Sequence, residues 1–316
     1  MTKYLLILLF YVLSTHSMMC ADIPDYESHT IIHDGLKRTY LVHFPKNMDK
    51  KSRRPLIIAL HGGLGNGKRM MELTSYKFNE LSDKENFIVV YPDGIGKNWN
   101  DGRKNMPGRY KAHNRNIDDV GFISTLIDTM VNYYNVDSTR VFVTGMSNGA
   151  IMSQRLAIEL SDKIAAAAPV CGNIPEDLES TPKNAVAMMI INGTKDPLVP
   201  YDGGYVHFGK KKLGKVCSTD ESIKFWVKHN QVKTDPVTTK IENINISDSC
   251  NIEKTTYFTP CNCKNVVLIS VKNGGHTWPG GKQYLGKKLI GNTNRDIDAC
   301  QVIWDFFNVQ FVSLYD

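Results

Sequence analysis

Short runs of apolar residues recur along this chain, and stretches with a helical pattern separate them. Runs of Val, Ile and Ala without polar alternation are typical of strands buried on both faces, as in a parallel sheet. Two of the intervening stretches, 120–134 and 148–160, carry helical patterns. This alternation predicts an α/β fold with a mainly parallel, doubly wound sheet and helices on both faces. The predicted strands are residues 55–60, 87–91, 141–144, 165–170, 185–191 and 266–271.

The remaining segments add a hairpin, a closing helix and one interruption. Residues 30–32 and 39–44 flank a glycine-containing turn and predict an antiparallel hairpin, and residues 301–311 predict a last helix. The segment at about 197–265 carries one helix, begun by a capping pattern at Ser218, and is otherwise mostly polar. We expect this segment to be an excursion from the sheet and not a separate domain, because one large α/β domain accommodates such an insertion.

The first residues have the layout of a secretory signal peptide. Lys3 precedes an apolar run over residues 4–13 and then a stretch of small and polar residues. The run is too short for a transmembrane helix, which needs about 20 apolar residues. We therefore predict a leader over residues 1–21, export to the extracellular space or the periplasm, no membrane span, and one folded domain over residues 22–316. Lipid attachment at Cys20 ranks second, because the residues before it match a lipidation signal poorly.

Composition indicates an ordinary globular protein and predicts neither a nucleic-acid partner nor a metal. Hydrophobic residues make up 42% of the chain and charged residues 22%, which excludes disordered and multi-span membrane proteins. The net charge of +6 includes lysines at 210–212 and 215, but no nucleic-acid-binding motif or interleaved aromatic pattern accompanies them. Apart from Cys20, six cysteines remain, an even number that favours disulfides in an exported chain. Cys261 and Cys263 lack the partners of a zinc site.

The strongest local motif is Gly145-Met146-Ser147-Asn148-Gly149, which lies between a predicted strand and a predicted helix. The glycines allow a sharp turn in which strand and helix come close together while the serine hydroxyl stays exposed. A serine hydroxyl is a weak nucleophile, and it needs a neighbouring base and a third group that orients the base. The motif therefore predicts Ser147 as the nucleophile of an acyl-transfer enzyme.

The base and the orienting acid are predicted from their places after later strands. His276 lies in a glycine-flanked turn, residues 274–281, after the last predicted strand. Asp196 follows the strand before it, and we prefer Asp196 to Asp202 because it lies nearer the end of that strand. The order Ser147, Asp196, His276 is that of α/β hydrolases and differs from the orders of trypsin-like and subtilisin-like proteases. The sequence therefore predicts the α/β-hydrolase fold with these three residues at one edge of the sheet.

A tetrahedral intermediate also needs hydrogen-bond donors for its oxyanion. The backbone amide of Asn148 is one predicted donor, because it directly follows the nucleophile. The His-Gly-Gly-Leu sequence at residues 61–64 ends an early strand and resembles an HGG-type oxyanion loop. The amide of Gly63 is our first choice for the second donor and the amide of Leu64 the alternative, with His61 in a structural role.

With these residues in place, the chain resembles the polyhydroxybutyrate depolymerase and feruloyl-esterase-like family of secreted α/β-hydrolase serine esterases over about residues 39–307. The resemblance implies Ser147 as nucleophile, Asp196 as acid and His276 as base, in agreement with the assignment from the residues. Besides the loop at His61 and the serine motif, the matching segments are residues 91–94, 99–103, 118–122, 193–196, 199–201 and 275–281.

Family members commonly carry a cysteine after the helix that ends near Asn230, where this chain has Gln231 and Val232. The usual disulfide is therefore in doubt, and we expect Cys250 to pair with Cys261 or Cys263 instead. Two tryptophans next to matched motifs, Trp99 and Trp278, are candidates for a substrate wall, since aromatic side chains supply apolar area beside a polar centre. Packing in the core is the alternative for both tryptophans.

These observations predict a secreted, monomeric serine esterase that hydrolyses carboxylic esters through an acyl-enzyme and needs no cofactor. The expected substrates are polyhydroxybutyrate-type oligomers or feruloyl and acetyl esters of polysaccharides. The alternatives are a non-catalytic polymer- or carbohydrate-binding protein and a peptidase, both on the same fold. Residues 62–68 also match the phosphate-binding loop of nucleotide hydrolases, but Arg69 stands where that motif needs Ser or Thr to hold magnesium.

Overall fold

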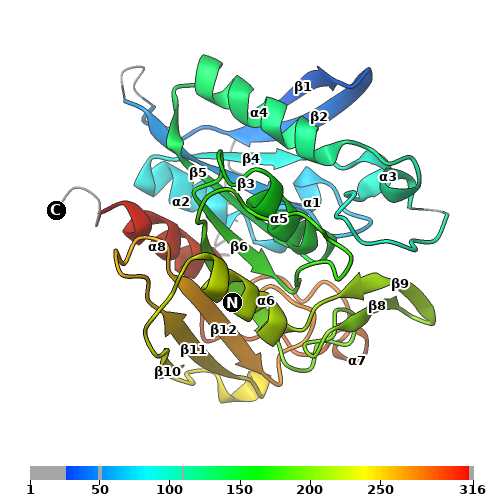
Figure 1. The fold of residues 1–316 in the computed structure, drawn as a ribbon, viewed down its shortest axis with the longest axis vertical. Helices are drawn as coiled ribbons and strands as arrows, with labels where there is room; N and C mark the ends of the chain where they lie inside the picture. The colour runs from blue at the N-terminus through cyan, green and yellow to red at the C-terminus, as the bar shows by residue number, and fades with distance from the viewer. Residues whose placement is uncertain (1–25, 49–51, 109, 313–316) are drawn as a thin grey trace, which may run out of the picture.

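A ten-stranded sheet organises residues 26–48, 52–108 and 110–312, which the computed structural model describes (Figure 1). Six central strands, in the order β4-β3-β5-β6-β7-β12, run parallel to one another. Antiparallel strands complete both edges, with β2 and β1 beside β4 and with β11 and β10 beside β12. The predicted α/β fold with a mainly parallel sheet is confirmed.

The strands of this sheet are β1 (Glu27–His33), β2 (Leu36–His43), β3 (Arg54–Leu60), β4 (Ile88–Pro92), β5 (Val136–Met146), β6 (Ala166–Val170), β7 (Ala187–Gly193), β10 (Val237–Ile241), β11 (Asn251–Tyr257) and β12 (Val266–Lys272). The α-helices are α1 (Gly67–Leu73), α2 (Lys77–Glu85), α3 (Lys111–Asn114), α4 (Asp119–Tyr133), α5 (Asn148–Glu159), α6 (Thr219–His229), α7 (Lys287–Ile290) and α8 (Ala299–Val312). Two short 3₁₀ helices, η1 (Ile95–Lys97) and η2 (Ile246–Asp248), lie in loops.

Alternate side chains of the central strands enter two separate cores. In β3, Leu56, Ile58 and Leu60 belong to the core that includes side chains of α4, α5 and α6. Ile57 and Ala59 belong to the core on the opposite face, with side chains of α1, α2 and α8. A strand covered on both faces has no polar side, which explains the continuous apolar runs in the sequence. The predicted helices on both faces of the sheet are confirmed.

The segment at 197–265 leaves the main sheet only in part. β8 (Gly204–Phe208) and β9 (Lys211–Val216) form a separate two-stranded antiparallel sheet, and α6 follows with the predicted capping box at Ser218. β11 then pairs with β12, and β10 pairs with β11, so the rest of the segment forms one edge of the main sheet. The side chains of β10 are mostly exposed. Such an edge strand lacks the apolar run by which the central strands were found.

Cysteine pairing differs from the prediction for Cys250. Cys261 and Cys263 form a disulfide with each other, and Cys250 is a buried free thiol. Cys250 precedes β11 and the disulfide follows it, so a strand of seven residues separates them. An extended strand of that length spans roughly 20 Å, far more than a disulfide can bridge. The other cysteines that are free among the described residues are Cys171, Cys217 and Cys300.

The N-terminal predictions concern a part of the chain that the structure does not describe. Both the leader over residues 1–21 and Cys20 lie outside the described residues. Within the described part of the chain, none of the helices has the length and apolar character needed to cross a bilayer.

Candidate active site

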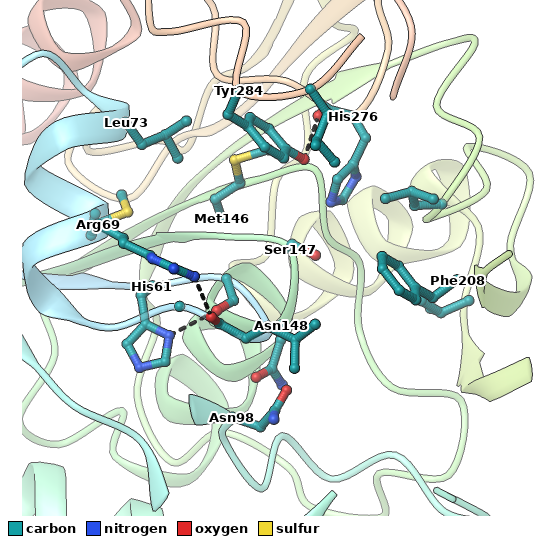
Figure 2. Close-up of a pocket in the computed structure, with 18 of the residues that line it drawn as sticks. His61, Arg69, Leu73, Asn98, Met146, Ser147, Asn148, Phe208, His276 and Tyr284 are labelled. Carbon is teal, nitrogen blue, oxygen red and sulfur yellow. Dashed lines mark hydrogen bonds between the residues drawn. The ribbon is translucent and has the colours of Figure 1, made fainter. Parts of the chain in front are cut away.

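A pocket of about 600 Å³ lies where the parallel strands end (Figure 2). Its lining includes the loop after β3 at residues 61–65, Ser147 after β5, and His276 after β12. The carboxyl ends of parallel strands meet at one edge of a sheet, so the topology brings together residues that are far apart in the sequence. In Figure 2 the imidazole of His276 is directed toward the hydroxyl of Ser147.

Ser147 sits at a sharp turn between β5 and α5. Its backbone angles are φ 59° and ψ −120°, which non-glycine residues rarely adopt. A Cβ atom on Gly145 would lie 2.6 Å from the carbonyl oxygen of Gly149, and one on Gly149 would lie 2.6 Å from the carbonyl oxygen of His61. Only glycine leaves room for the backbones to approach so closely. The strand, turn and helix predicted around this motif are present, and the serine hydroxyl faces the pocket.

Asp196 and His276 form a buried hydrogen-bonded pair. The Nδ1 atom of His276 lies 2.7 Å from Oδ2 of Asp196, and both side chains are only 2% exposed. The other carboxylate oxygen, Oδ1, accepts hydrogen bonds from the amides of Leu198 and Val199, at 2.8 and 2.9 Å. This arrangement holds the imidazole in one orientation and leaves its Nε2 atom for the pocket. Asp202, the alternative acid, is exposed on the same loop.

The loop that contains His276 is held in place by hydrogen bonds to its backbone carbonyls and amides. The amide of His276 donates to the carbonyl of Ile290 at 2.6 Å, and the hydroxyl of Tyr284 donates to the carbonyl of His276 at 3.1 Å (Figure 2). The thiol of Cys171 lies 3.3 Å from the carbonyl oxygen of Thr277, below the same turn. These contacts come from three different parts of the chain, so the position of the imidazole is determined on several sides.

One group among the described residues has the composition of a metal site. The ligand atoms of Cys171, Asp196 and His276 lie within 4.8 Å of one another. Two of these atoms already share the hydrogen bond between Asp196 and His276. Burial, followed by the charge of Asp196, raises the pKa of the Cys171 thiol well above its usual value, whereas metals bind the thiolate. The contacts therefore favour an acid and base pair over a metal centre.

The candidate oxyanion donors differ in whether their amides are free. The amide of Leu64 donates to the carbonyl of Lys97 at 2.8 Å, so Leu64 is unsuitable as a donor for substrate. The amides of Gly63 and Asn148 have no hydrogen-bond partner among the described residues, and both residues line the pocket. A Cβ atom on Gly62 would lie 3.5 Å from Cβ of Ser147, so this loop packs directly against the serine. The geometry favours Gly63, our first choice, together with Asn148.

His61 has a structural position, as predicted. Its Nδ1 atom donates to the carbonyl of Gly62 at 2.8 Å, and its Nε2 atom accepts from the amide of Gly94 at 3.0 Å. Burial lowers the pKa of His61 to about 4, so the ring is neutral at pH 7 and suited to one donor and one acceptor contact. His61 therefore connects the oxyanion loop to the loop after β4.

The prediction of a substrate wall at Trp99 and Trp278 is wrong. Both indoles are completely buried, and neither lines the pocket. Trp99 packs 4.9 Å from the ring of His61 and donates from Nε1 to the carbonyl of His61 at 2.9 Å. Trp278 packs edge-on against Phe78 in a core of the sheet. The aromatic residues that do line the pocket are Tyr110, Phe208 and Tyr284.

A buried network of charged side chains supports the turn at Ser147. The sequence alone did not predict a role for these side chains. The side chain of Asn148 donates to Oδ2 of Asp101 at 2.6 Å. Asp101 also accepts from Arg103 at 2.7 Å and from His113 at 2.8 Å, and its side chain is fully buried. Arg103 in turn donates to the carbonyl of Leu213 in β9. The motif at residues 99–103 was the sequence signal from which this network could have been predicted, because it places the acidic residue Asp101 two positions before the basic residue Arg103.

Comparisons with known proteins agree with this geometry. The family described as Esterase PHB depolymerase matches residues 39–204, more than half of the chain. The protein named "Putative esterase NocK" from Nocardia uniformis subsp. tsuyamanensis is 26% identical over 280 residues, which are 86% of this chain and 79% of that protein. Feruloyl esterase B from Piromyces equi is 27% identical over 256 residues, and the match covers 78% of this chain but only 44% of that protein.

The solved structure of an acetyl xylan esterase from Aspergillus awamori has a TM-score of 0.54 and 18% identity, and the match covers 79% of this chain and 94% of that one. At this identity the likeness concerns the fold alone. The family match, together with the parallel sheet and the serine turn, identifies the chain: it belongs to the esterase PHB depolymerase family and is an esterase with the α/β-hydrolase fold.

Proposed function

We propose that this esterase hydrolyses carboxylic esters through an acyl-enzyme on Ser147. His276 removes the proton of the Ser147 hydroxyl as the oxygen attacks the ester carbonyl, and the imidazolium then protonates the departing alcohol. Asp196 orients the imidazole and stabilises its charge. Water, activated by the same histidine, releases the acid and restores the serine. One observation carries this proposal: His276 is hydrogen-bonded to Asp196 at 2.7 Å, and His276 and Ser147 line the same pocket.

The tetrahedral intermediates formed in these two steps carry a negative oxygen. We propose that the amides of Gly63 and Asn148 stabilise it, because both are free of protein partners among the described residues and line the pocket next to Ser147. Fixed amides that point at the developing charge need no reorganisation during the reaction, which is why such donors contribute strongly to catalysis.

The lining of the pocket supports ester substrates with an apolar or aromatic part. Met146, Leu198 and Leu213 supply apolar surface, and Phe208 and Tyr284 supply rings. Feruloyl and acetyl esters of polysaccharides and hydroxybutyrate oligomers therefore remain the proposed substrates. Action outside the cytoplasm, through the leader predicted over residues 1–21, is part of the same proposal.

Replacement of the serine tests the function. We expect Ser147→Ala to lower kcat on 4-nitrophenyl acetate by several orders of magnitude, on the order of 10⁶-fold, as removal of a triad nucleophile does. The wild-type protein should react with a fluorophosphonate probe, and Ser147→Ala should not. Ser180→Ala, which removes an exposed hydroxyl, is the matched control. Labelling of Ser147→Ala at the wild-type rate would overturn the proposal, and a wild-type protein that neither reacts nor hydrolyses would favour a binding role.

A further inference from the structure

The charges around the pocket are mostly positive. Its lining contains three permanent cations, Arg69, Arg103 and Lys282, and one acid, Glu72. Arg103 is neutralised by its buried ion pair with Asp101. Neither Arg69 nor Lys282 has an acidic partner within 4.0 Å among the residues that the structure describes. Two free cations on an apolar pocket indicate a ligand that carries negative charge.

Arg69 is held in a position suited to bind such a ligand. It extends from α1, and its Nη1 atom donates to the carbonyl oxygen of Leu64 at 2.9 Å, on the loop beside the serine (Figure 2). The other N–H groups of the guanidinium have no protein acceptor in the described part of the chain. One hydrogen bond therefore fixes the side chain near the reacting centre, while the remaining donors are available. A guanidinium offers paired N–H groups that match the two oxygens of a carboxylate.

Lys282 lies on the same wall of the pocket. Its backbone amide donates to the carbonyl of Leu73 at the end of α1, one turn beyond Arg69. Its side chain is exposed and free to reach a ligand at the mouth. The two cations thus come from distant parts of the sequence, and this backbone contact holds the residue Lys282 against the helix that carries Arg69.

Exposed lysines lie close to the opposite wall of the pocket. It is formed by the β8 and β9 hairpin, in which His207 and Phe208 line the pocket. Their register partners in β9 are Lys212 and Lys211, and both lysines are exposed. Directly opposed residues of antiparallel strands lie about 5 Å apart at their Cβ atoms. Neither lysine lines the pocket, and the Nζ atom of Lys212 lies 4.4 Å from the centre of the Tyr205 ring, so these lysines add positive charge close to the pocket without entering it.

We propose that the preferred substrate is an anionic ester, one whose acyl part carries a free carboxylate, and that Arg69 binds this carboxylate with Lys282 contributing at the mouth. This inference rests on the proposed function at Ser147 and narrows its substrate class. A hydroxyacid oligomer ending in a carboxylate and an acidic acyl chain share this chemistry. The cations draw the substrate toward the pocket over roughly the Debye length of 10 Å, so salt weakens the preference.

A matched pair of substrates tests the proposal. 4-Nitrophenyl hydrogen adipate ends its acyl chain in a carboxylate, and 4-nitrophenyl 6-methylheptanoate has an isopropyl group of the same shape there. The readout is the ratio of kcat/KM for the anionic over the neutral ester, at low salt and in about 0.5 M NaCl. We expect Arg69→Gln to lower this ratio by about tenfold and Lys282→Gln by two- to threefold, in the range of one charge-assisted hydrogen bond and one exposed charge. The ratio of the wild type should fall at high salt.

Lys224→Gln is the control, because Lys224 is an exposed lysine on α6 outside the pocket lining, and its ratio should equal that of the wild type. Arg69→Lys keeps the charge without the paired donors and should lie between the wild type and Arg69→Gln. A ratio unchanged within twofold in both Arg69→Gln and Lys282→Gln would overturn the inference. If the wild type hydrolyses neither ester, nor 4-nitrophenyl acetate, and does not react with the fluorophosphonate probe, the proposed function fails with it. Activity on 4-nitrophenyl acetate or on the neutral ester, without a charge-dependent ratio, rejects only the anionic substrate.

Discussion

Asp101 is the buried charge that connects the turn at Ser147 to its surroundings, and we predict that Asp101→Asn weakens both the fold and catalysis. Its carboxylate accepts hydrogen bonds from Asn148, Arg103 and His113, and the shortest from each residue has a donor to acceptor distance between 2.6 and 2.8 Å. Asparagine has nearly the same shape but no charge, and its amide nitrogen cannot accept these hydrogen bonds. The substitution therefore removes the counterion of Arg103 and at least one contact to the turn.

The expected loss follows from the burial of the ion pair. The side chain of Arg103 is 4% exposed and that of Asp101 is 0% exposed, so no water replaces the missing partner. Removal of one member of a buried pair costs about 3 to 5 kcal/mol. Since asparagine keeps one acceptor oxygen, we expect the lower end, about 3 kcal/mol. For a domain of this size that corresponds to a fall in Tm of roughly 6 to 12 °C.

The loss should depend on pH in a defined direction. Burial alone would raise the pKa of Asp101, but the charges and hydrogen bonds of Arg103 and His113 outweigh it and hold the pKa well below its usual range. A carboxyl with a depressed pKa in the folded state stabilises the fold fully above its pKa in the unfolded chain, about 3.9, and this contribution is lost as the pH falls below that value. The difference between wild type and Asp101→Asn should therefore be full at pH 7 and shrink below about pH 4.

Urea unfolding followed by tryptophan fluorescence at pH 7 and pH 3.5 measures this difference. Asp162→Asn, at an exposed site, is the matched control and should change the free energy of unfolding by less than about 0.5 kcal/mol. We also expect kcat of Asp101→Asn to fall about tenfold, less than the 10²-fold or more caused by removal of an oxyanion donor, because the amide of Asn148 is displaced and not deleted. A variant that loses under about 1 kcal/mol and keeps the wild-type kcat would refute this role of Asp101.

Two further predictions concern His61 and Gly149. His61 binds a proton near pH 6.5 in the unfolded chain but only near pH 4 in the folded chain, so the free energy of unfolding should fall by about 3 kcal/mol as the pH drops through this window. NMR titration of the His61 ring should give a midpoint near 4. A midpoint above 6 would contradict the burial argument. Gly149→Ala would bring a methyl group against the backbone oxygens of Leu60 and His61, and it should lower the free energy of unfolding in urea by at least about 2 kcal/mol. The control Gly286→Ala, at a position with open space around it, should be near neutral. Equal stabilities of the two variants would disprove the packing constraint.

Local signals in the sequence were sufficient to predict the central strands and the order of Ser147, Asp196 and His276 along the chain. The six parallel strands were recognised because burial on both faces leaves an unbroken apolar run, and the turn at Ser147 was recognised because only glycine fits at Gly145 and Gly149. The edge strands β10 and β11 gave no such run. Their side chains are largely exposed or half-buried, so hydropathy alone made that part of the segment at 197–265 look like a loop.

Contacts between distant loops could not be deduced in the same way. Trp99 and Trp278 lie in loops close to the site, and a loop has no periodicity that shows which way a side chain points. Only the fold reveals that the indole of Trp99 turns inward to the carbonyl of His61. Cys250 is a similar case, because the seven residues of β11 that hold it apart from Cys261 and Cys263 were not recognised as a strand.

The segment at residues 93–101 explains why a motif near a site need not touch substrate. The amide of Gly94 donates to His61, the carbonyl of Lys97 accepts from Leu64, and the amide of Trp99 donates to the side chain of Asn148 at 2.8 Å. This one segment thus fixes both predicted sides of the oxyanion site, while its side chains at Trp99, Asn100 and Asp101 are buried outside the pocket lining. Precise placement of backbone amides needs this kind of support, because a donor displaced by a fraction of an ångström stabilises the oxyanion less. Trp99 and Asp101 therefore carry a strong sequence signal for a positional reason, and substitutions at these two residues should act on kcat through Asn148 and not through contact with the ester.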